Sequence, residues 1–487
     1  MLGSSFLNTA AGFLSLIAGL ISSIVVARLL GVEGAGAVAY ALWIMTAATL
    51  ASDLGIPQAL LRFAAQEGGE RTGVVRSLTR RFAIGTALAA AAILIFAAWR
   101  CFSVAAADAW TWVATAGLFL AYAWSTLALG AGQGLSRFRE TSLATAIGSL
   151  LQPFAVALGA LVLGPVGAIL GHVFRHLPLA LMTHRYVPAG PSAEVPTAVN
   201  AYARNNWLSG GLAALLGSRV ELAVIGVWFG VAEVGQYATA ATMAGMIVQL
   251  SFSLAAVLVP LFAAHHDRGE QMALVRSYRR SLTGLSLVLA PVCFGGAAVA
   301  PVLVSTLFGA DFAPAGDLAM VLVAFALAQA LTTVPYRMML AQERSRAVLN
   351  LSIWEGIGCI VLILIAVPLW GSFGAAWVKG LTATASLLFC LFYCRYRLGV
   401  PFEPLALLKI LLAAALCGIT AATVLAWAPG LAGLALAVFA GAISYVLMLA
   451  LTAAVPYEDR CMVADWACPH LPASLARVLS RILKPRE

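Results

Sequence analysis

Apolar residues fill this chain in runs of about twenty, and short polar or glycine-containing stretches separate the runs. At 1.5 Å per residue, an α-helix of that length crosses a hydrocarbon core ~30 Å thick. The pattern therefore predicts an all-α, polytopic membrane protein with about fourteen transmembrane helices. The expected spans are residues 6–27, 37–64, 82–99, 110–132, 141–162, 166–186, 207–229, 234–262, 282–307, 318–340, 347–367, 373–393, 405–427 and 431–453.

The chain also repeats itself. The sequence LLGVEGAGAVA at residues 29–39 recurs as WFGVAEVGQYA at 228–238, and the glycines of Gly164-x-x-Gly167 recur as Gly371-x-x-Gly374. Each copy holds an even number of expected spans, six, so the copies are parallel repeats related by an axis along the membrane normal. The repeat predicts two six-helix lobes, followed by two further helices and a tail.

These boundaries give an expected domain organisation. The parts are an N-lobe at residues 1–190, a linker rich in proline and alanine at 191–203, a C-lobe at 204–398, two helices at 399–456 and a tail at 457–487. Apolar and basic residues alternate at helical spacing in the tail, which predicts an amphipathic helix lying on the inner leaflet.

Composition supports the membrane assignment. Of the 487 residues, 62% are hydrophobic and only 10% are charged, and the mean hydropathy is +0.96. A soluble domain would ordinarily carry roughly a quarter charged residues to cover its surface. The chain is therefore expected to lie almost entirely in a lipid bilayer.

Basic residues alternate between the two sides of the predicted spans. Every second connection is basic, and these connections together with the tail hold 23 of the 29 Lys and Arg residues. The opposite connections hold only Arg28 and Arg100. Short loops rich in Lys and Arg remain in the cytoplasm, so both termini are predicted to be cytoplasmic. The net charge of +9 then reflects topology and not nucleic-acid binding.

Several kinds of chemistry have no signature in the sequence. The Walker, zinc-protease and nucleophile-elbow patterns are missing. The eight cysteines include no Cys-x-x-Cys pair, so we interpret them as small apolar packing residues and not as disulfide or metal ligands. No cofactor and no metal site is expected.

Four segments resemble a known family. They are VARLLGVEGAGAVAYALWIMT at 26–46, DLGIPQALLRFAAQ at 53–66, VELAVIGVWFGVAEVGQYATAATMA at 220–244 and LVSTLFGADFAPA at 303–315. In order and spacing, these segments resemble the oligosaccharide flippases, the polysaccharide-transporter branch of the multidrug/oligosaccharidyl-lipid/polysaccharide superfamily. One departure is the charged pair Arg219 and Glu221 in the seventh span, where the family often has an Asp.

The resemblance implies a fold and an activity. It implies a V-shaped pair of six-helix lobes in a bacterial inner membrane, which moves a polyprenyl-diphosphate-linked glycan to the outer leaflet by alternating access. Such transport serves surface polysaccharide synthesis (O-antigen, exopolysaccharide or capsule), in which a polysaccharide polymerase and a chain-length regulator are expected partners. The implied protein is a transporter and not an enzyme.

Charged residues within the spans are the candidate substrate site, because each costs roughly 2.5–3.5 kcal/mol at the centre of a helix. His172, Arg175 and His176 recur at i, i+3 and i+4 and so share one helix face. The repeat that pairs Gly164 with Gly371 also pairs His172 with Lys379, which predicts that these two face each other across a central cavity. Two further cations would add to a cationic cavity for the diphosphate: Arg28 and Arg219.

Each of these residues has an alternative structural reading. Arg219 could pair with Glu221, and either histidine could be a satisfied interior group. Asp53, Glu221 and Glu355 are candidate ion-coupling residues, although Asp53 and Glu355 could simply pair with neighbouring arginines, and we favour that pairing.

Two other functions compete with the flippase. A multidrug or cation antiporter of the same superfamily would favour carboxylates in its cavity, which the charge inventory opposes. A membrane glycan polymerase or ligase would need a sizeable outer loop with catalytic residues, and the expected outer loops are about ten residues long.

Overall fold

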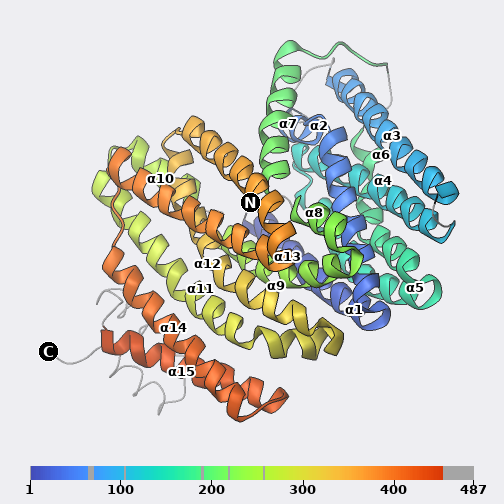
Figure 1. Ribbon diagram of the computed structural model, residues 1–487. Helices are drawn as coiled ribbons and strands as arrows, with labels where there is room; N and C mark the ends of the chain where they lie inside the picture. Colours follow the sequence, from blue (N-terminus) through green and yellow to red (C-terminus); the bar gives the residue numbers. More distant parts are fainter. Residues whose placement is uncertain are drawn as a thin grey trace. The chain divides into compact units, whose positions relative to one another are not determined.

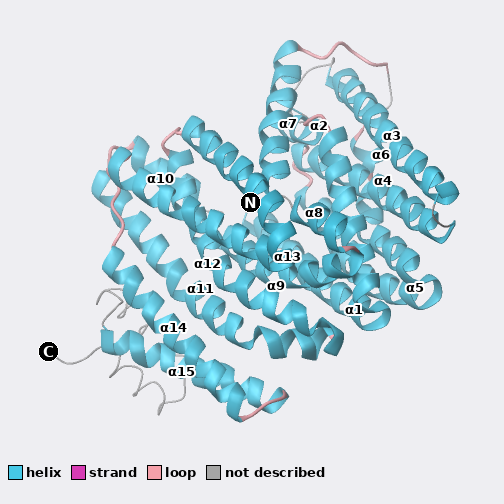
Figure 2. Cartoon of the chain, viewed as in Figure 1, coloured by secondary structure: helices cyan, strands magenta, loops and turns pink. Residues whose placement is uncertain are grey.

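The computed structural model describes residues 2–63, 71–103, 106–187, 191–217, 220–255 and 258–452. Over these residues the chain is helical apart from short connections, and the described part contains no strand (Figure 1, Figure 2). Two predicted features lie outside the described residues: the tail at 457–487 and Arg219.

The helices follow one another closely. They are α1 (Leu2–Ser52), α2 (Ile56–Phe63), α3 (Arg71–Ser103), α4 (Ala106–Gly134), α5 (Phe138–Leu181), α6 (Thr183–Tyr186), α7 (Thr197–Gly217), α8 (Val220–Phe229), α9 (Val231–Leu254), α10 (Leu258–Asp267), α11 (Gln271–Phe308), the short η2 (Ala310–Phe312), α12 (Ala313–Ala341), α13 (Ser345–Arg397), α14 (Pro404–Trp427) and α15 (Leu431–Thr452).

Three of these helices are interrupted by a glycine. Gly31 in α1, Gly164 in α5 and Gly371 in α13 have φ values of 66°, 60° and 59°, a left-handed conformation that side chains other than glycine rarely adopt. Each glycine divides its helix into two limbs. Ten helices of the described residues are long and apolar enough to cross a membrane, and the three breaks raise the number of spanning segments to thirteen. Helices α7 and α8 together occupy the expected span 207–229 and supply one more segment. The total agrees with the predicted fourteen.

The backbone confirms the internal repeat. Gly164 and Gly371, paired by the sequence repeat, have nearly the same dihedral angles, with ψ values of −139° and −148°. In α5 the two limbs approach so closely that a Cβ on Gly167 would overlap the Gly159 carbonyl, and in α13 a Cβ on Gly374 would overlap the carbonyl of Ala366. Both helices therefore fold back on themselves in the same way.

The chain forms two compact units. Unit 1 comprises Met1–Thr242, Leu307–Ala315 and Leu349–Val378, and unit 2 comprises Met243–Thr306, Gly316–Val348 and Lys379–Glu487. In unit 1, α5 packs on α1 and on α4. In unit 2, α14 and α15 lie side by side (Figure 1), and the Tyr445 hydroxyl on α15 donates to the Leu287 carbonyl on α11 at 2.9 Å. The lobe boundaries expected from the repeat stay predictions.

The expected linker is shorter than its composition indicated. Helix α7 begins at Thr197, within the predicted linker 191–203, directly after Pro196, whose carbonyl accepts the first helical bonds. The preceding segment packs on α3, where the Ser77 hydroxyl donates to the Ala193 carbonyl at 2.5 Å. Proline fits the start of a helix because its missing N–H has no partner there in any case, so a proline-rich stretch can begin a helix as well as interrupt one.

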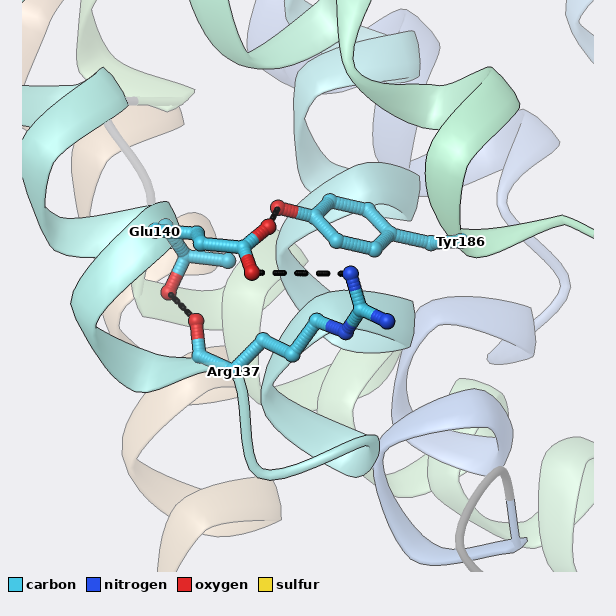
Figure 3. A network of polar contacts seen from close by, with 4 residues as sticks. Arg137, Glu140 and Tyr186 are labelled. Carbon is cyan, nitrogen blue, oxygen red and sulfur yellow. Dashed lines mark hydrogen bonds and ion pairs between the residues drawn. The ribbon is translucent and has the colours of Figure 1, made fainter.

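Polar contacts in unit 1 join the basic connections to one another. Because α5 reverses at Gly164, its two ends lie on the same side, and Glu140 links them by accepting from Arg137 at 3.4 Å and from the Tyr186 hydroxyl at 3.3 Å (Figure 3). Arg81 at the start of α3 donates to Asn200 of α7 at 2.7 Å. The alternation of basic connections requires that they share one side, and these contacts place three of them together.

Labelling can test which side this is. In a variant that lacks the eight native cysteines, we expect Ser136→Cys to react with a membrane-impermeant maleimide only after the membrane is opened. Ala310→Cys, exposed at the start of η2, should react in intact cells, because arginine-rich loops stay inside. The reverse pattern would invert the predicted topology.

Candidate functional site

The intramembrane cation Arg175 lies where the two limbs of α5 touch. A Cβ on Gly148 would overlap the Arg175 carbonyl, and a Cβ on Gly171 would meet the backbone of Val156. Small residues at such positions let helix backbones approach closely. The close approach puts the residues one turn after Gly148, including Gln152, directly beside the stripe formed by His172, Arg175 and His176.

Arg175 is held by neutral acceptors. Its Nη1 donates to Gln152 Oε1 at 3.3 Å and to the Ser15 carbonyl of α1 at 3.5 Å. Gly19 of α1 makes room for the guanidinium, since a Cβ there would lie 3.6 Å from Nη1. Among the described residues no carboxylate lies within 4.0 Å of Arg175, and α1 has no ionisable side chain between Leu2 and Ala27.

Gln152 also binds His172. Its Nε2 lies 3.0 Å from His172 Nδ1, and the two side chains are 1% and 7% exposed. One further contact joins α1 to the first limb of α5: the hydroxyls of Ser15 and Ser149 hydrogen-bond each other at 2.6 Å. A polar network thus crosses the interface between α1 and α5 inside the membrane-spanning part of unit 1.

His176 extends this network to α4. The Ser125 hydroxyl donates to the Tyr122 carbonyl at 2.7 Å, so it accepts from His176 Nδ1 at 3.3 Å. The Tyr122 ring meets the His176 ring edge-on, with centroids 5.0 Å apart. Because the Ser125 hydroxyl has a single hydrogen and donates it to Tyr122, the proton between Ser125 and His176 belongs to His176 Nδ1. The structure therefore brings together the three cationic candidates of the sixth predicted span.

The other predicted cations lie elsewhere. Arg28 is exposed and donates through Nε to the Leu307 carbonyl at 2.9 Å, nine residues or ~14 Å along α1 from Gly19. Lys379 is half-buried on α13 at the start of the last segment of unit 2, so its expected position opposite His172 stays a prediction.

The three candidate ion-coupling residues differ in their surroundings. The Asp53 carboxylate accepts from the Gly55 N–H at 2.9 Å in the turn before α2. Glu221 is buried at the start of α8, and Glu355 is exposed on α13. Asp53 therefore caps a turn, and its coupling role, like that of the two glutamates, stays a prediction. The described residues contain no cluster of His, Cys, Asp and Glu that could hold a metal ion.

A second feature of unit 1 is a symmetric contact between α1 and α9. A Cβ on Gly36 would overlap the Val231 carbonyl, and a Cβ on Gly235 would overlap the carbonyl of Val32. The sequence repeat pairs Gly36 with Gly235 and Val32 with Val231. Each repeat thus offers the same glycine to the same carbonyl of the other, as in an isologous interface.

Polar groups close the edge of this glycine contact. The Gln236 side chain donates to the Asp311 carbonyl at 2.8 Å and accepts from the Ala315 N–H at 3.0 Å. The Ser372 hydroxyl donates to Glu233. Together with the bond from Arg28 to Leu307, these contacts join α1 and α9 to residues 307–315 and to α13 within unit 1.

Gln152 is the residue of the site that charge patterns did not reveal. An amide carries no formal charge and so does not appear in a search for intramembrane cations and carboxylates. A glutamine within a predicted span, however, must find hydrogen-bond partners, because a buried amide without them costs several kcal/mol in an apolar medium. A glutamine inside a predicted span therefore indicates a polar partner nearby, and this was the sequence signal for Gln152.

Comparisons with known proteins agree with this fold. The polysaccharide biosynthesis protein family model matches residues 25–317. A comparison with curated protein sequences finds no match. Among solved structures, the chain is similar to the lipid II flippase MurJ in an inward closed conformation, at 12% identity and a TM-score of 0.70, over 92% of this chain and 98% of that one.

Two other structures of the same superfamily are also similar. An inward-facing multidrug resistance MATE family transporter of the MOP superfamily has 15% identity and a TM-score of 0.63, over 79% of this chain and 94% of that one. A MOP superfamily transporter from Pyrococcus furiosus Vc1 has 15% identity and a TM-score of 0.54, over 81% and 94% of the two chains. At these identities the similarities show the fold alone, and the apolar helices of the chain make it a multi-pass membrane protein.

Proposed function

Because the chain belongs to the polysaccharide biosynthesis protein family, we propose that it is a flippase for a polyprenyl-diphosphate-linked oligosaccharide. The lipid-linked glycan would move from the cytoplasmic to the outer leaflet of a bacterial inner membrane, with both protein termini in the cytoplasm. There a polymerase and a chain-length regulator would build O-antigen, exopolysaccharide or capsule from it.

The observation that carries this proposal is the uncompensated charge of Arg175. A guanidinium inside the spanning part of a protein is costly, and such residues commonly mark the pathway of a substrate or an ion. Its hydrogen bonds in the described residues go from Nη1 to an amide and a carbonyl, which leaves Nε and Nη2 to meet a ligand. A planar fork of N–H donors fits the oxygens of a phosphate. A diphosphate is the part of the proposed substrate that needs such a partner most.

The protein's task is to replace water around the head group. A diphosphate and several sugar hydroxyls cannot enter hydrocarbon unaided, because each buried charge or unpaired hydroxyl costs several kcal/mol. The hydroxyls of Ser15, Ser149 and Ser125 and the two histidines belong to the same polar network as Arg175 and add hydrogen-bond donors and acceptors to it. Lys379, the repeat counterpart of His172, would supply a second cation. The prenyl tail would remain in the lipid.

The membrane potential supplies a driving force. Moving two negative charges outward across an inside-negative membrane releases ~4–5 kcal/mol per 100 mV. A counter-ion becomes necessary only if cationic side chains cross the field together with the substrate.

The antiporter and enzyme alternatives fit this site less well. An exporter of organic cations needs an anionic cavity, whereas the polar network of α1, α4 and α5 contains a guanidinium that has no carboxylate within 4.0 Å among the residues that the structure describes. A polymerase or ligase needs a nucleophile and a general base beside the sugar. The Ser125 hydroxyl lies beside His176 but donates its hydrogen to the Tyr122 carbonyl, so this pair is not arranged as a nucleophile and its base.

Reconstitution tests the function directly. Purified protein in liposomes with an inside-negative potential should move a polyprenyl diphosphate carrying a fluorescent disaccharide between leaflets, measured by quenching with dithionite. A fluorescent phosphatidylcholine should not move, because it lacks the diphosphate. Export of tetraphenylphosphonium without movement of the glycan lipid would show an antiporter instead.

A further inference from the structure

We propose that Gln152 is the positioning residue of this site: its amide fixes Arg175 in place without neutralising it, and at the same time keeps His172 uncharged. The proposal rests on the proposed function for the nature of the ligand, a prenyl diphosphate. Gln152 is fully buried on the first limb of α5, and both of its polar atoms have a partner on the second limb.

The orientation of the Gln152 amide follows from Arg175. A guanidinium has donors and no acceptor, so the group that meets Arg175 Nη1 at 3.3 Å must be the amide oxygen. The flipped amide would set N–H groups against N–H groups. The amide nitrogen therefore faces His172, whatever the histidine's own preference.

This orientation determines the state of His172. The amide nitrogen donates, so His172 Nδ1 at 3.0 Å must accept. An imidazole that accepts at Nδ1 carries its single proton on Nε2 and is neutral. Protonation of Nδ1 would set two donors against each other and break the contact between Gln152 and His172. His172 thus contributes an N–H donor to the site, whereas sequence analysis counted it as a cation.

The neighbouring helices do not alter this balance of charge. On α5 the ionisable groups that face Gln152 are Arg175, His172 and His176. Helix α4 brings Tyr122, whose ring meets the His176 ring, and α1 brings no ionisable side chain between Leu2 and Ala27.

An amide is the side chain that this position requires. A glutamate of the same length would hold Arg175 equally well, but as an ion pair that competes with the phosphate. A methionine would leave the guanidinium charged and held only by the Ser15 carbonyl. Gln152 orients the cation and leaves its charge for the ligand, which is the behaviour expected of a supporting residue in a preorganised site.

Two substitutions separate these effects. We expect Gln152→Glu to weaken binding of farnesyl diphosphate by the full-length protein in nanodiscs at least tenfold at pH 7.5, with an unchanged or raised midpoint of thermal unfolding, because the new carboxylate pairs with Arg175. Gln152→Met should weaken binding less and lower the midpoint, because two buried polar contacts disappear. Gln58→Glu, an exposed position on α2, controls for added negative charge.

The opposite order of the two variants in binding and in stability is the diagnostic result. A merely structural glutamine would make the loss of binding follow the loss of stability.

Three outcomes distinguish this proposal from the proposed function. Equal binding by wild type and both variants, or tighter binding by Gln152→Glu than by Gln152→Met, would overturn the role of Gln152 alone. Wild-type protein that binds farnesyl diphosphate, with the expected variant order, but does not move the glycan lipid would overturn the flippase and leave Gln152 as assigned. Wild-type protein that does not bind farnesyl diphosphate would overturn both.

Discussion

Arg175→Ala should abolish movement of the glycan lipid while the protein still inserts and folds. Loss of charge-assisted hydrogen bonds to phosphate costs about 3 kcal/mol, or ~100-fold in rate, and the vacated space leaves the head group without a replacement for its water. Arg175→Lys should fall between alanine and wild type, because lysine keeps the charge but lacks the planar fork. The measurement is dithionite quenching in proteoliposomes at equal protein content.

Arg139→Ala is the matched control for this experiment. Arg139 lies on the same helix, is exposed at its start, and carries the same charge outside the spanning part. Its removal should leave transport nearly unchanged. Lys379→Ala tests the repeat argument separately, since a strong loss would support a second cation from the other half of the chain. Normal transport by both Arg175→Ala and Lys379→Ala would refute the cationic site and assign both residues to structural contacts.

The sequence predicted correctly those features that depend on long runs of residues or on a single residue type. Spans of about twenty apolar residues have one solution in a bilayer, because every backbone group must be satisfied within its own helix. The repeat of Gly164 at Gly371 carried over to the backbone, because only glycine takes the left-handed conformation at which α5 and α13 break. The stripe of His172, Arg175 and His176 also came together as helical spacing requires.

Sequence reasoning failed where a neighbour decides the chemistry. The charge of His172 depends on an amide twenty residues away that approaches only because Gly148 and Gly171 let the limbs of α5 touch. No pattern along one helix contains that information. Likewise, the composition of residues 191–203 suggested a linker over the whole segment, but a helix that packs on α1 and α2 begins at Thr197, directly after Pro196.

The glycine contact between α1 and α9 should be as important for transport as the cation site. Alternating access requires that the side opposite the basic connections, predicted to face outward, close and open in turn. Gly36→Ala or Gly235→Ala adds a methyl group where the facing backbone already touches the glycine, and such overpacking costs about 1–3 kcal/mol. The closed arrangement would lose population in favour of an open one.

Spin labels can measure that shift. Glu33 and Ala232 are exposed, occupy equivalent positions of the two repeats, and flank the glycine contact. With cysteines at these positions in a background without the eight native ones, electron–electron resonance should give one short distance for the parent protein. Gly36→Ala should add a longer distance, and the double substitution Gly36→Ala/Gly235→Ala should make the longer distance dominant, with a fall of at least tenfold in glycan transport.

Gly117→Ala provides the comparison, because a Cβ there meets nothing within 4 Å. It lies within α4 of the same unit and should leave both the distance distribution and the transport rate unchanged. If Gly36→Ala and Gly235→Ala behave like Gly117→Ala, the two helices must separate at another point during transport. A methyl group in a contact that opens during transport would have to change the populations of the closed and open arrangements. Without such a change, the contact of Gly36 and Gly235 with the facing carbonyls would be a packing feature that stays closed throughout transport.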